Sequence, residues 1–165
     1  MDALELIRER RSIREYKEKM PADKDIEKIL DAGRWAPSGL NNQPWKFKVI
    51  KDRKQKDKLA EFTKYGDIIV SAPVVIAVLM DTADSYNRDK DLMAIGACIQ
   101  NMLLQASSVG VGTCWLGEAL NRKEEIREFL RLDKDLELMA LVTLGYSNED
   151  MTESCRRSLK ELIIE

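Results

Sequence analysis

The stretch APSGLNNQPW, Ala36–Trp45, is built of turn-forming residues and leads directly into the segment WKFKVI. Pro37 fixes its own φ angle, Gly39 permits a positive φ, and Asn41 tolerates the left-handed region, so the stretch predicts an ordered loop. Apolar and polar residues alternate along WKFKVI, which predicts a half-buried strand that begins where the loop ends. Hydroxyl and amide side chains at such a helix-to-strand junction can be presented to a ligand, although ordinary turn chemistry explains the loop better when it is taken alone.

The rest of the chain alternates between helical and extended patterns. The expected helices are residues 3–10, a helix capped by Asp23 that ends at Trp35, a charged helix capped by Asp52, residues 91–109, and KEEIREFL (123–130) capped by Asn121; the expected strands are residues 73–80, a short strand within 110–117, and residues 136–144. No internal repeat or low-complexity linker interrupts them, so the sequence predicts a single α+β domain over residues 1–165.

The segment Asp91–Val109 carries apolar residues on more than one face of the expected helix. Gly110 follows it as the expected C-terminal cap. Because little other chain is available to cover a helix of this kind, we expect it to lie at a subunit interface.

Composition excludes several classes of protein. The chain has 165 residues, a formal net charge of −2 and basic residues spread along its length, so no broad basic surface for nucleic acid is expected. Its three cysteines have no C-x-x-C spacing, which favours neither a disulfide framework nor a zinc site and fits a reducing cytosol. The longest apolar run, Ala72–Met80, is less than half of a membrane span, so we expect a cytoplasmic protein with no membrane partner.

Histidine is absent from the sequence, and this restricts the possible chemistry. There can be no Ser-His-Asp or Cys-His catalytic pair, no H-E-x-x-H zinc helix and no imidazole acting as acid or base near neutral pH. If the protein is an enzyme, a cofactor is expected to carry the difficult chemistry.

Arginines gather at two places, in RRSIR (Arg10–Arg14) and at Arg156–Arg157 near the C-terminus. Cations favour the C-terminal end of a helix and otherwise point to solvent, which is the simpler explanation of the first group. Anion binding is the alternative, because guanidinium groups and a hydroxyl together suit a phosphate. From the five residues alone, the simpler explanation is preferred.

The segment GVGTCWLG, Gly110–Gly117, is not a dinucleotide-binding fingerprint, because its glycines follow a helix rather than a strand. Gly112 and Gly117 would allow peptide N–H groups to approach a flat ligand closely. Cys114 is expected to be a small buried side chain, since nothing nearby in the sequence indicates an activated thiolate.

Taken together and in this order, RRSIR, APSGLNNQPW, AIGACIQNMLLQASSVGVGTCWLG and LGY with its RRSL tail resemble the FMN-dependent nitroreductase family. The resemblance extends over essentially the whole chain, and four motifs in register are fairly specific although each is weak alone. It implies a mixed, mainly antiparallel sheet flanked by helices. It also implies a homodimer whose long central helix lies at the interface, with two FMN molecules that are each contacted by both subunits.

The same resemblance assigns residues to the flavin. The motif that holds the phosphate, the ribityl chain and the pyrimidine edge is matched by Arg10, Arg11, Ser12 and Arg14. The tail motif that helps to bind the phosphate is matched by Arg156 and Arg157. The loop that reaches the flavin from the partner subunit is matched by Pro37, Ser38, Gly39 and Asn41. The segment against the ring is matched by Cys114, Trp115, Leu116 and Gly117.

The implied activity passes electrons from NADH or NADPH through FMN to a nitroaromatic, quinone or similar acceptor by a ping-pong mechanism. No catalytic side chain is obligatory, because the flavin carries the chemistry. Arg14 or Arg10 would stabilise the negative charge of the reduced ring, and a backbone N–H of Leu116 or Gly117 would donate to flavin N(5). The connector 81–90 has no room for the insertion that walls the pocket in longer relatives, so an open flavin face is expected.

Three alternatives remain at this point. The protein could be a non-catalytic FMN-binding dimer used for storage or sensing. It could belong to the relatives that cleave flavin or dehalogenate aromatic substrates, although these generally need an ordered lid and no segment of this sequence suggests one. It could also be a dimeric domain without flavin, in which the arginines are only solvated.

Overall fold

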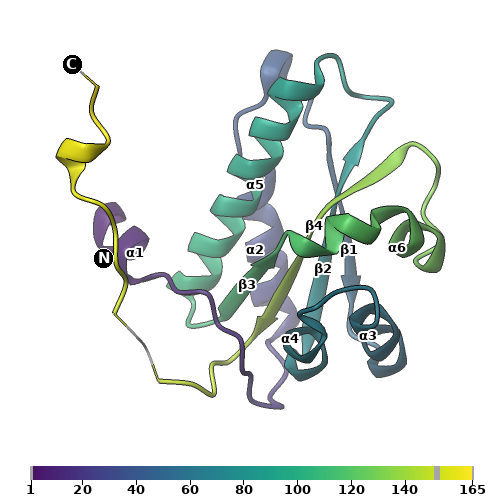
Figure 1. Ribbon diagram of the computed structural model, residues 1–165, viewed down its shortest axis with the longest axis horizontal. Coiled ribbons are helices and arrows are strands. Elements are labelled where there is room, and N and C mark those ends of the chain that lie inside the picture. The colour runs from purple at the N-terminus through teal and green to yellow at the C-terminus, as the bar shows by residue number, and fades with distance from the viewer. Residues whose placement is uncertain (1, 151–152, 165) are drawn as a thin grey trace.

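The computed structural model describes residues 2–150 and 153–164 (Figure 1). The helices are α1 (Ala3–Glu9), α2 (Asp23–Arg34), α3 (Arg53–Ala60), α4 (Gly66–Ser71), α5 (Arg88–Ser108) and α6 (Lys123–Phe129). The strands are β1 (Trp45–Ile50), β2 (Val74–Asp81), β3 (Gly112–Leu116) and β4 (Leu136–Gly145). Short 3₁₀ helices lie at Gly39–Asn41, Glu118–Arg122 and Leu159–Glu161.

The four strands form one sheet in the order β1-β2-β4-β3, and every neighbouring pair is antiparallel. Residues 74–80 of the central strand β2 are no more than 2% exposed, which confirms the predicted strand that is buried on both faces. Within the described residues, the one parallel contact is an isolated bridge between Ser12 and Thr113. The expected α+β fold with a mainly antiparallel sheet is therefore confirmed.

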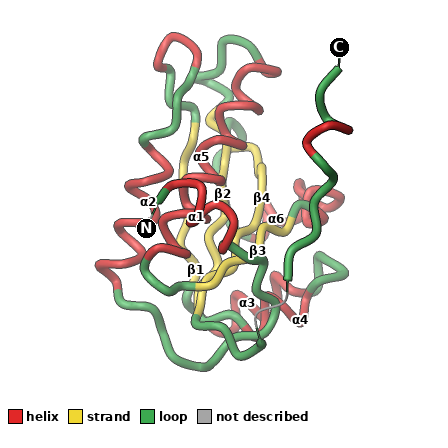
Figure 2. The backbone as a smooth tube through the Cα atoms, turned by 90° about the vertical axis from the view of Figure 1, so that its left-hand side faces the viewer, coloured by secondary structure: helices red, strands yellow, loops and turns green. Residues whose placement is uncertain are grey.

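Helices cover both faces of the sheet, and each face has its own apolar cluster (Figure 2). Helices α2 and α5 pack on one face, where Ile29 and Met102 are completely buried. Helices α3, α4 and α6 cover the other face, where Leu59 and Ile126 are completely buried. Burial of each such side chain contributes about 1.5–3 kcal/mol, so the two clusters hold the helices on the sheet.

Helix α5 begins at Arg88, three residues before the predicted start at Asp91. The reason is the cap, because the Asn87 side chain accepts the backbone N–H of Lys90 at 3.1 Å. Gly110 follows the helix with a φ of 73°, as predicted for its end. Neither α5 nor any other helix in the described ranges combines the length and the apolarity needed to cross a membrane.

Helix α5 and the C-terminal segment expose large apolar side chains to solvent in the single chain. Leu92 and Met93 on α5 are 40% and 67% exposed, so the second apolar face of this helix is not fully covered. The C-terminal segment 153–164 runs apart from the sheet on the side where α1 lies, and it exposes Leu162 and Ile163 (Figure 1). Both features leave apolar surface exposed in the single chain.

Of the three predicted N-terminal helix caps, two are wrong and one is right. Asp23 is the first residue of α2, whose cap is Ala22. Asn121 lies inside a 3₁₀ helix and donates its amide to the Glu118 carboxylate at 3.3 Å, so it does not cap α6. Asp52 does cap α3, because its carboxylate accepts a first-turn backbone N–H at 2.8 Å.

Candidate functional site

The RRSIR segment follows α1 and is held along the β3 edge of the sheet. The backbone N–H of Ile13 donates to Thr113 O at 2.8 Å, and the Ile13 side chain is buried. Tyr16 fixes the next turn, because its hydroxyl lies 2.7 Å from both Ile13 O and Thr143 Oγ1. Burial raises the pKa of Tyr16, so the hydroxyl stays protonated and remains available as a donor. The backbone next to the arginines is therefore rigid.

Gly112 is needed for this contact. A Cβ at Gly112 would lie 2.7 Å from Cγ1 of Ile13, so the absence of a side chain lets the N-terminal segment lie on β3. The approach of the Gly112 backbone to a flat ligand stays a prediction. The same expectation agrees with the structure at Gly117, where a Cβ would meet nothing within 4 Å.

Four arginines, including Arg8, and one acid, Glu153, line a cavity of about 590 Å³ between α1, α5 and the C-terminal segment. Arg10, Arg11 and Arg156 line it together with Gln100 from α5. Burial lowers the pKa of Arg10, and the charges of Arg156 and Arg11 lower it further. Like charges are gathered here against their mutual repulsion, which is the arrangement that favours a bound anion.

Arg11 also has a structural role. Its guanidinium donates to the carbonyl oxygens of Arg8 and Arg10, which are left over at the end of α1. Both explanations of the cluster that the sequence leaves open therefore apply. Arg11 closes a helix and also lines the cavity that Arg10 shares with Arg156.

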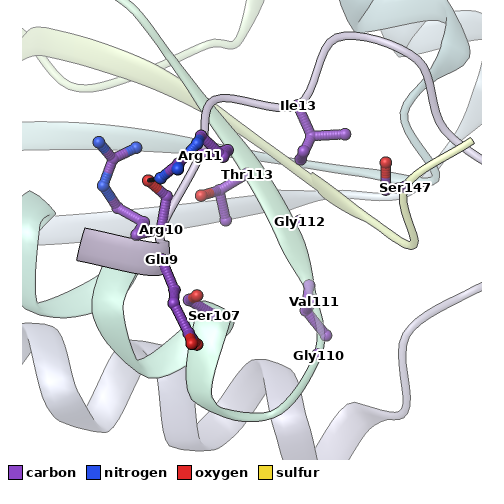
Figure 3. A pocket seen from close by; sticks show the side chains of 10 residues that line it. All are labelled: Glu9, Arg10, Arg11, Ile13, Ser107, Gly110, Val111, Gly112, Thr113 and Ser147. Carbon is purple, nitrogen blue, oxygen red and sulfur yellow. Dashed lines mark hydrogen bonds between the residues drawn. The ribbon is translucent and has the colours of Figure 1, made fainter. Parts of the chain in front are cut away.

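A smaller cavity of about 160 Å³ lies between the N-terminal segment and the turn that follows α5 (Figure 3). It shares Arg10 and Arg11 with the larger cavity, and Ser107, Thr113 and Ser147 bring hydroxyl groups to its wall. The two arginines thus stand between two hollows in the surface.

The end of β3 presents the segment predicted to lie against a ring. Cys114 and Leu116 are buried, whereas Trp115 and Gly117 are exposed. Burial raises the pKa of Cys114, which confirms that it is a buried thiol and not an activated thiolate. The carboxylate of the next residue, Glu118, accepts two hydrogen bonds from the loop after α3, one from a hydroxyl group at 2.5 Å and one from a backbone N–H at 3.0 Å. This anchor fixes the end of the strand.

Arg14 is exposed but its backbone is tightly held. Its N–H donates to Oε1 of Glu149 at 2.6 Å, and its carbonyl accepts the hydroxyl of Ser71 at 3.3 Å. Its guanidinium donates to Ser12 O at 3.2 Å. No signal in the sequence indicated Glu149, which follows the LGY motif as one acid among several and is half-buried in the structure.

The loop 36–45 has a strained backbone, which was predicted from the sequence at Asn41 but not at Leu40 or Gln43. Leu40, Asn41 and Gln43 have φ angles of 54°, 56° and 48°, a conformation that costs most L-residues roughly 1–2 kcal/mol. Gly39 is required for a different reason, because a Cβ there would lie 1.8 Å from the hydroxyl oxygen of Tyr86. The loop is therefore pressed against the connector between β2 and α5.

A buried carboxylate ties the loop to this connector. Asp91 is 0% exposed and accepts hydrogen bonds from Asn42 Nδ2 at 2.8 Å, Ser85 Oγ at 2.6 Å and the backbone N–H of Asn87 at 3.4 Å. Burial alone would raise the pKa of Asp91, but these hydrogen bonds outweigh it and lower the pKa. The second amide proton of Asn42 goes to Asp84 O at 3.1 Å, so Asn42 Oδ1 is buried with no partner within the described residues.

The predicted site residues form two groups within one chain. The N-terminal motif and Arg156 share one cavity, and Ser12 of that motif bridges to Thr113 near the start of β3, whereas Pro37, Ser38 and Gly39 line a separate hollow of about 240 Å³ beside α5. Asn41 lies exposed on the same loop, and Arg157 lies exposed next to Arg156. The residues that the resemblance assigns to the flavin therefore lie in two separate places in a single chain.

Comparison with known proteins gives a consistent result. The chain matches the sequence model of the nitroreductase family over residues 7–65 and 63–146. It is 36% identical over 152 residues to an Archaeoglobus fulgidus protein named "Putative NADH dehydrogenase/NAD(P)H nitroreductase", with 90% of this chain and 87% of the relative covered. A Methanothermobacter thermautotrophicus protein of the same name is 34% identical over 152 residues, with 91% and 80% covered.

The fold comparison agrees with the sequence comparison. A crystal structure from Desulfovibrio desulfuricans, described as a "putative nitroreductase in complex with fmn", has a TM-score of 0.94 and 44% sequence identity. The match covers 98% of this chain and 95% of that chain. The antiparallel sheet and the long helix α5 both fit this result. The chain belongs to the nitroreductase family.

Proposed function

We propose that the protein is an FMN-dependent oxidoreductase that takes electrons from NADH or NADPH and passes them to a nitroaromatic, quinone or similar acceptor. The observation that carries the proposal is the convergence of Arg10, Arg11 and Arg156 on one cavity between α1, α5 and the C-terminal segment. The FMN in the 44% identical structure supports the same cofactor here.

The residues of this chain fit the parts of FMN. Arg10 and Arg156, with Arg157 next to them, supply the guanidinium groups that a phosphate monoester requires. Trp115 and Gly117 are exposed at the end of β3, so this segment can lie against a flat ring without a clash from a side chain at position 117. The donor set thus matches an anionic group at one end and a planar ring at the other.

The bound flavin would supply the redox chemistry, and the protein's own groups would hold and polarise it. The Arg14 or Arg10 guanidinium would stabilise negative charge at the pyrimidine edge of the reduced ring. The backbone N–H of Leu116 or Gly117 would donate to N(5). Cys114 would contribute bulk rather than chemistry, because its thiol is buried and protonated. The absence of histidine is compatible with this division of roles.

The residues assigned to the flavin lie in two separate places in one chain, and this separation supports a homodimer. In the proposed dimer, the loop with Pro37, Ser38, Gly39 and Asn41 completes the flavin site of the partner subunit. The exposed Leu92 and Met93 of α5 and the apolar C-terminal segment would then be covered by the second copy. Sedimentation equilibrium should give twice the mass of one chain; a monomer at micromolar concentration would contradict the dimer.

An absorption spectrum tests the function directly. The protein is incubated with FMN, desalted, and then mixed anaerobically with NADH or NADPH. We expect retained flavin that loses its absorption within seconds with at least one nicotinamide. Retained flavin that stays oxidised with both would favour the storage or sensing alternative. A desalted protein without flavin would refute the proposal.

A further inference from the structure

Glu149 belongs to none of the recognised motifs, yet it is held among residues that we assign to the flavin. Its Oε1 atom accepts the backbone N–H of Arg14 at 2.6 Å. The surrounding turn is fixed as well, because the Ser147 hydroxyl donates to Glu149 O at 3.0 Å and the backbone N–H of Asn148 donates to Glu15 O at 2.9 Å. The carboxylate is therefore held by its hydrogen bond to Arg14, on a turn whose backbone is fixed by further hydrogen bonds.

The charge of Glu149 acts on the same region as the charges of Arg10 and Arg14. Burial raises the pKa of Cys114, both arginines lower it, and Glu149 raises it. Glu149 also raises the pKa of Tyr16, which Arg14 lowers. The start of the ring-binding segment thus lies within the electrostatic reach of two guanidinium groups and one carboxylate.

The carboxylate does not simply neutralise Arg14. It binds the backbone of Arg14, whereas the guanidinium of Arg14 is turned towards Ser12 O at 3.2 Å. The positive group therefore remains available to a ligand while the negative group stays close to it. Such an arrangement reduces the net positive potential at the site without removing the guanidinium.

We propose that Glu149 is a positioning residue for Arg14 whose negative charge also lowers the reduction potential of the bound flavin. The inference rests on the proposed function, since it needs FMN beside Arg14. The oxidised ring is neutral and the reduced ring carries negative charge, so a nearby carboxylate disfavours the reduced form more than the oxidised form. Glu149 would thus keep the reduced flavin a stronger electron donor than the arginines alone would allow.

Three variants separate charge from position. Glu149→Gln keeps the shape and an oxygen that can accept the Arg14 N–H, but it removes the charge. Glu149→Asp keeps the charge and shortens the side chain. Glu124→Gln is the matched control, because it removes one negative charge from α6, where Glu124 pairs with Arg127 at 2.9 Å, outside the residues assigned to the site.

The measured quantities are the midpoint potential of the bound flavin against a reference dye and the dissociation constant of oxidised FMN. In Glu149→Gln, the ratio of the affinities for reduced and oxidised FMN should rise about fivefold. For a two-electron couple, in which tenfold corresponds to 29.6 mV, this is a positive shift of about 20 mV. Glu149→Asp should stay closer to the native potential, and Glu124→Gln should match it.

The outcomes distinguish this inference from the proposed function. A positive shift in Glu149→Gln with an unchanged control supports the inference. An unchanged potential in Glu149→Gln, or an equal shift in Glu124→Gln, overturns it while the proposed function stands. A native protein that retains no FMN overturns both. Loss of thermal stability without a change of potential would show that Glu149 is only structural, which also overturns the inference.

Discussion

Replacement of Asp91 by alanine tests whether the strained loop is held from outside its own sequence. Asp91 is completely buried and accepts hydrogen bonds from the Asn42 side chain in the loop and the Ser85 hydroxyl in the connector. Alanine leaves both donors inside the protein without their acceptor. It also removes a buried charge, and this relief offsets part of the loss.

The magnitude follows from these bonds. A buried polar group that loses its partner costs about 1–3 kcal/mol. Asn42 keeps one acceptor, Asp84 O, so we assign the lower half of that range to it and the full range to Ser85. After the relief from removing the charge, Asp91→Ala should lower the free energy of unfolding by about 2–4 kcal/mol. For a domain of this size, the melting temperature would fall by about 5–12 °C.

Urea unfolding of the protein without FMN, followed by far-ultraviolet circular dichroism, measures this change. Asp89→Ala is the matched control, because Asp89 is exposed in the same first turn of α5. Its loss should cost only the interaction with the helix dipole, about 0.3–1 kcal/mol. Equal effects of the two substitutions, or a loss below about 1 kcal/mol for Asp91→Ala, would refute the tie between loop and connector.

Four other outcomes are expected. Arg14→Ala should lower the reduction potential of the flavin and the rate of its reduction more than it lowers FMN retention. Arg157→Ala should mainly weaken FMN retention, on the order of tenfold. Equal effects of the two substitutions would contradict this division. Glu137→Gln should lower stability near pH 7 by about 1–2 kcal/mol. Hydrogen bonding to Arg88 lowers the pKa of Glu137 from 4.5 to about 2. This contribution to stability is therefore present above pH 4.5 and is lost as the pH falls towards 2. If Glu137→Gln lowered the free energy of unfolding equally at about pH 7 and about pH 2.5, the prediction would be refuted. Gly39→Ala should weaken FMN binding at unchanged circular dichroism, because the Cβ meets the Tyr86 hydroxyl, and unchanged affinity would show that the loop does not contact the flavin. Initial rates with a nicotinamide and a quinone should give parallel double-reciprocal lines, and intersecting lines would count against the ping-pong mechanism.

The main elements could be predicted from the sequence because their signals are local. The unbroken apolar run at residues 73–80 predicted β2, and the alternation at Trp45–Ile50 predicted β1. The long apolar helix was also recognised, although its start was missed, because Asn87 looks like part of a polar connector until its side chain is seen to cap the helix. Periodicity therefore identified the elements, and capping geometry decided where they begin.

The residues that hold the site together could not be predicted in this way. Asp91 and Asn42 are 49 positions apart, and Glu149 and Arg14 are 135 positions apart. In the sequence, Asp91 looks like an ordinary acid near a helix start, and Glu149 looks like an ordinary acid after a strand. Their importance depends on tertiary contacts that no local pattern contains.

The loop 36–45 illustrates how tertiary contacts hold a segment in shape. Three non-glycine residues of the loop have positive φ angles, which a free loop would relax, and Leu40 at its tip is 85% exposed. Contacts within the chain oppose this relaxation, through Asp91 and Tyr86 and through the hydrogen bond from the Gln43 N–H to Ser38 Oγ. The loop is therefore held in shape before any second subunit arrives, and it points its tip away from its own core. A preformed loop loses little conformational entropy when it docks, so this arrangement suits a segment that completes a site on another copy of the chain.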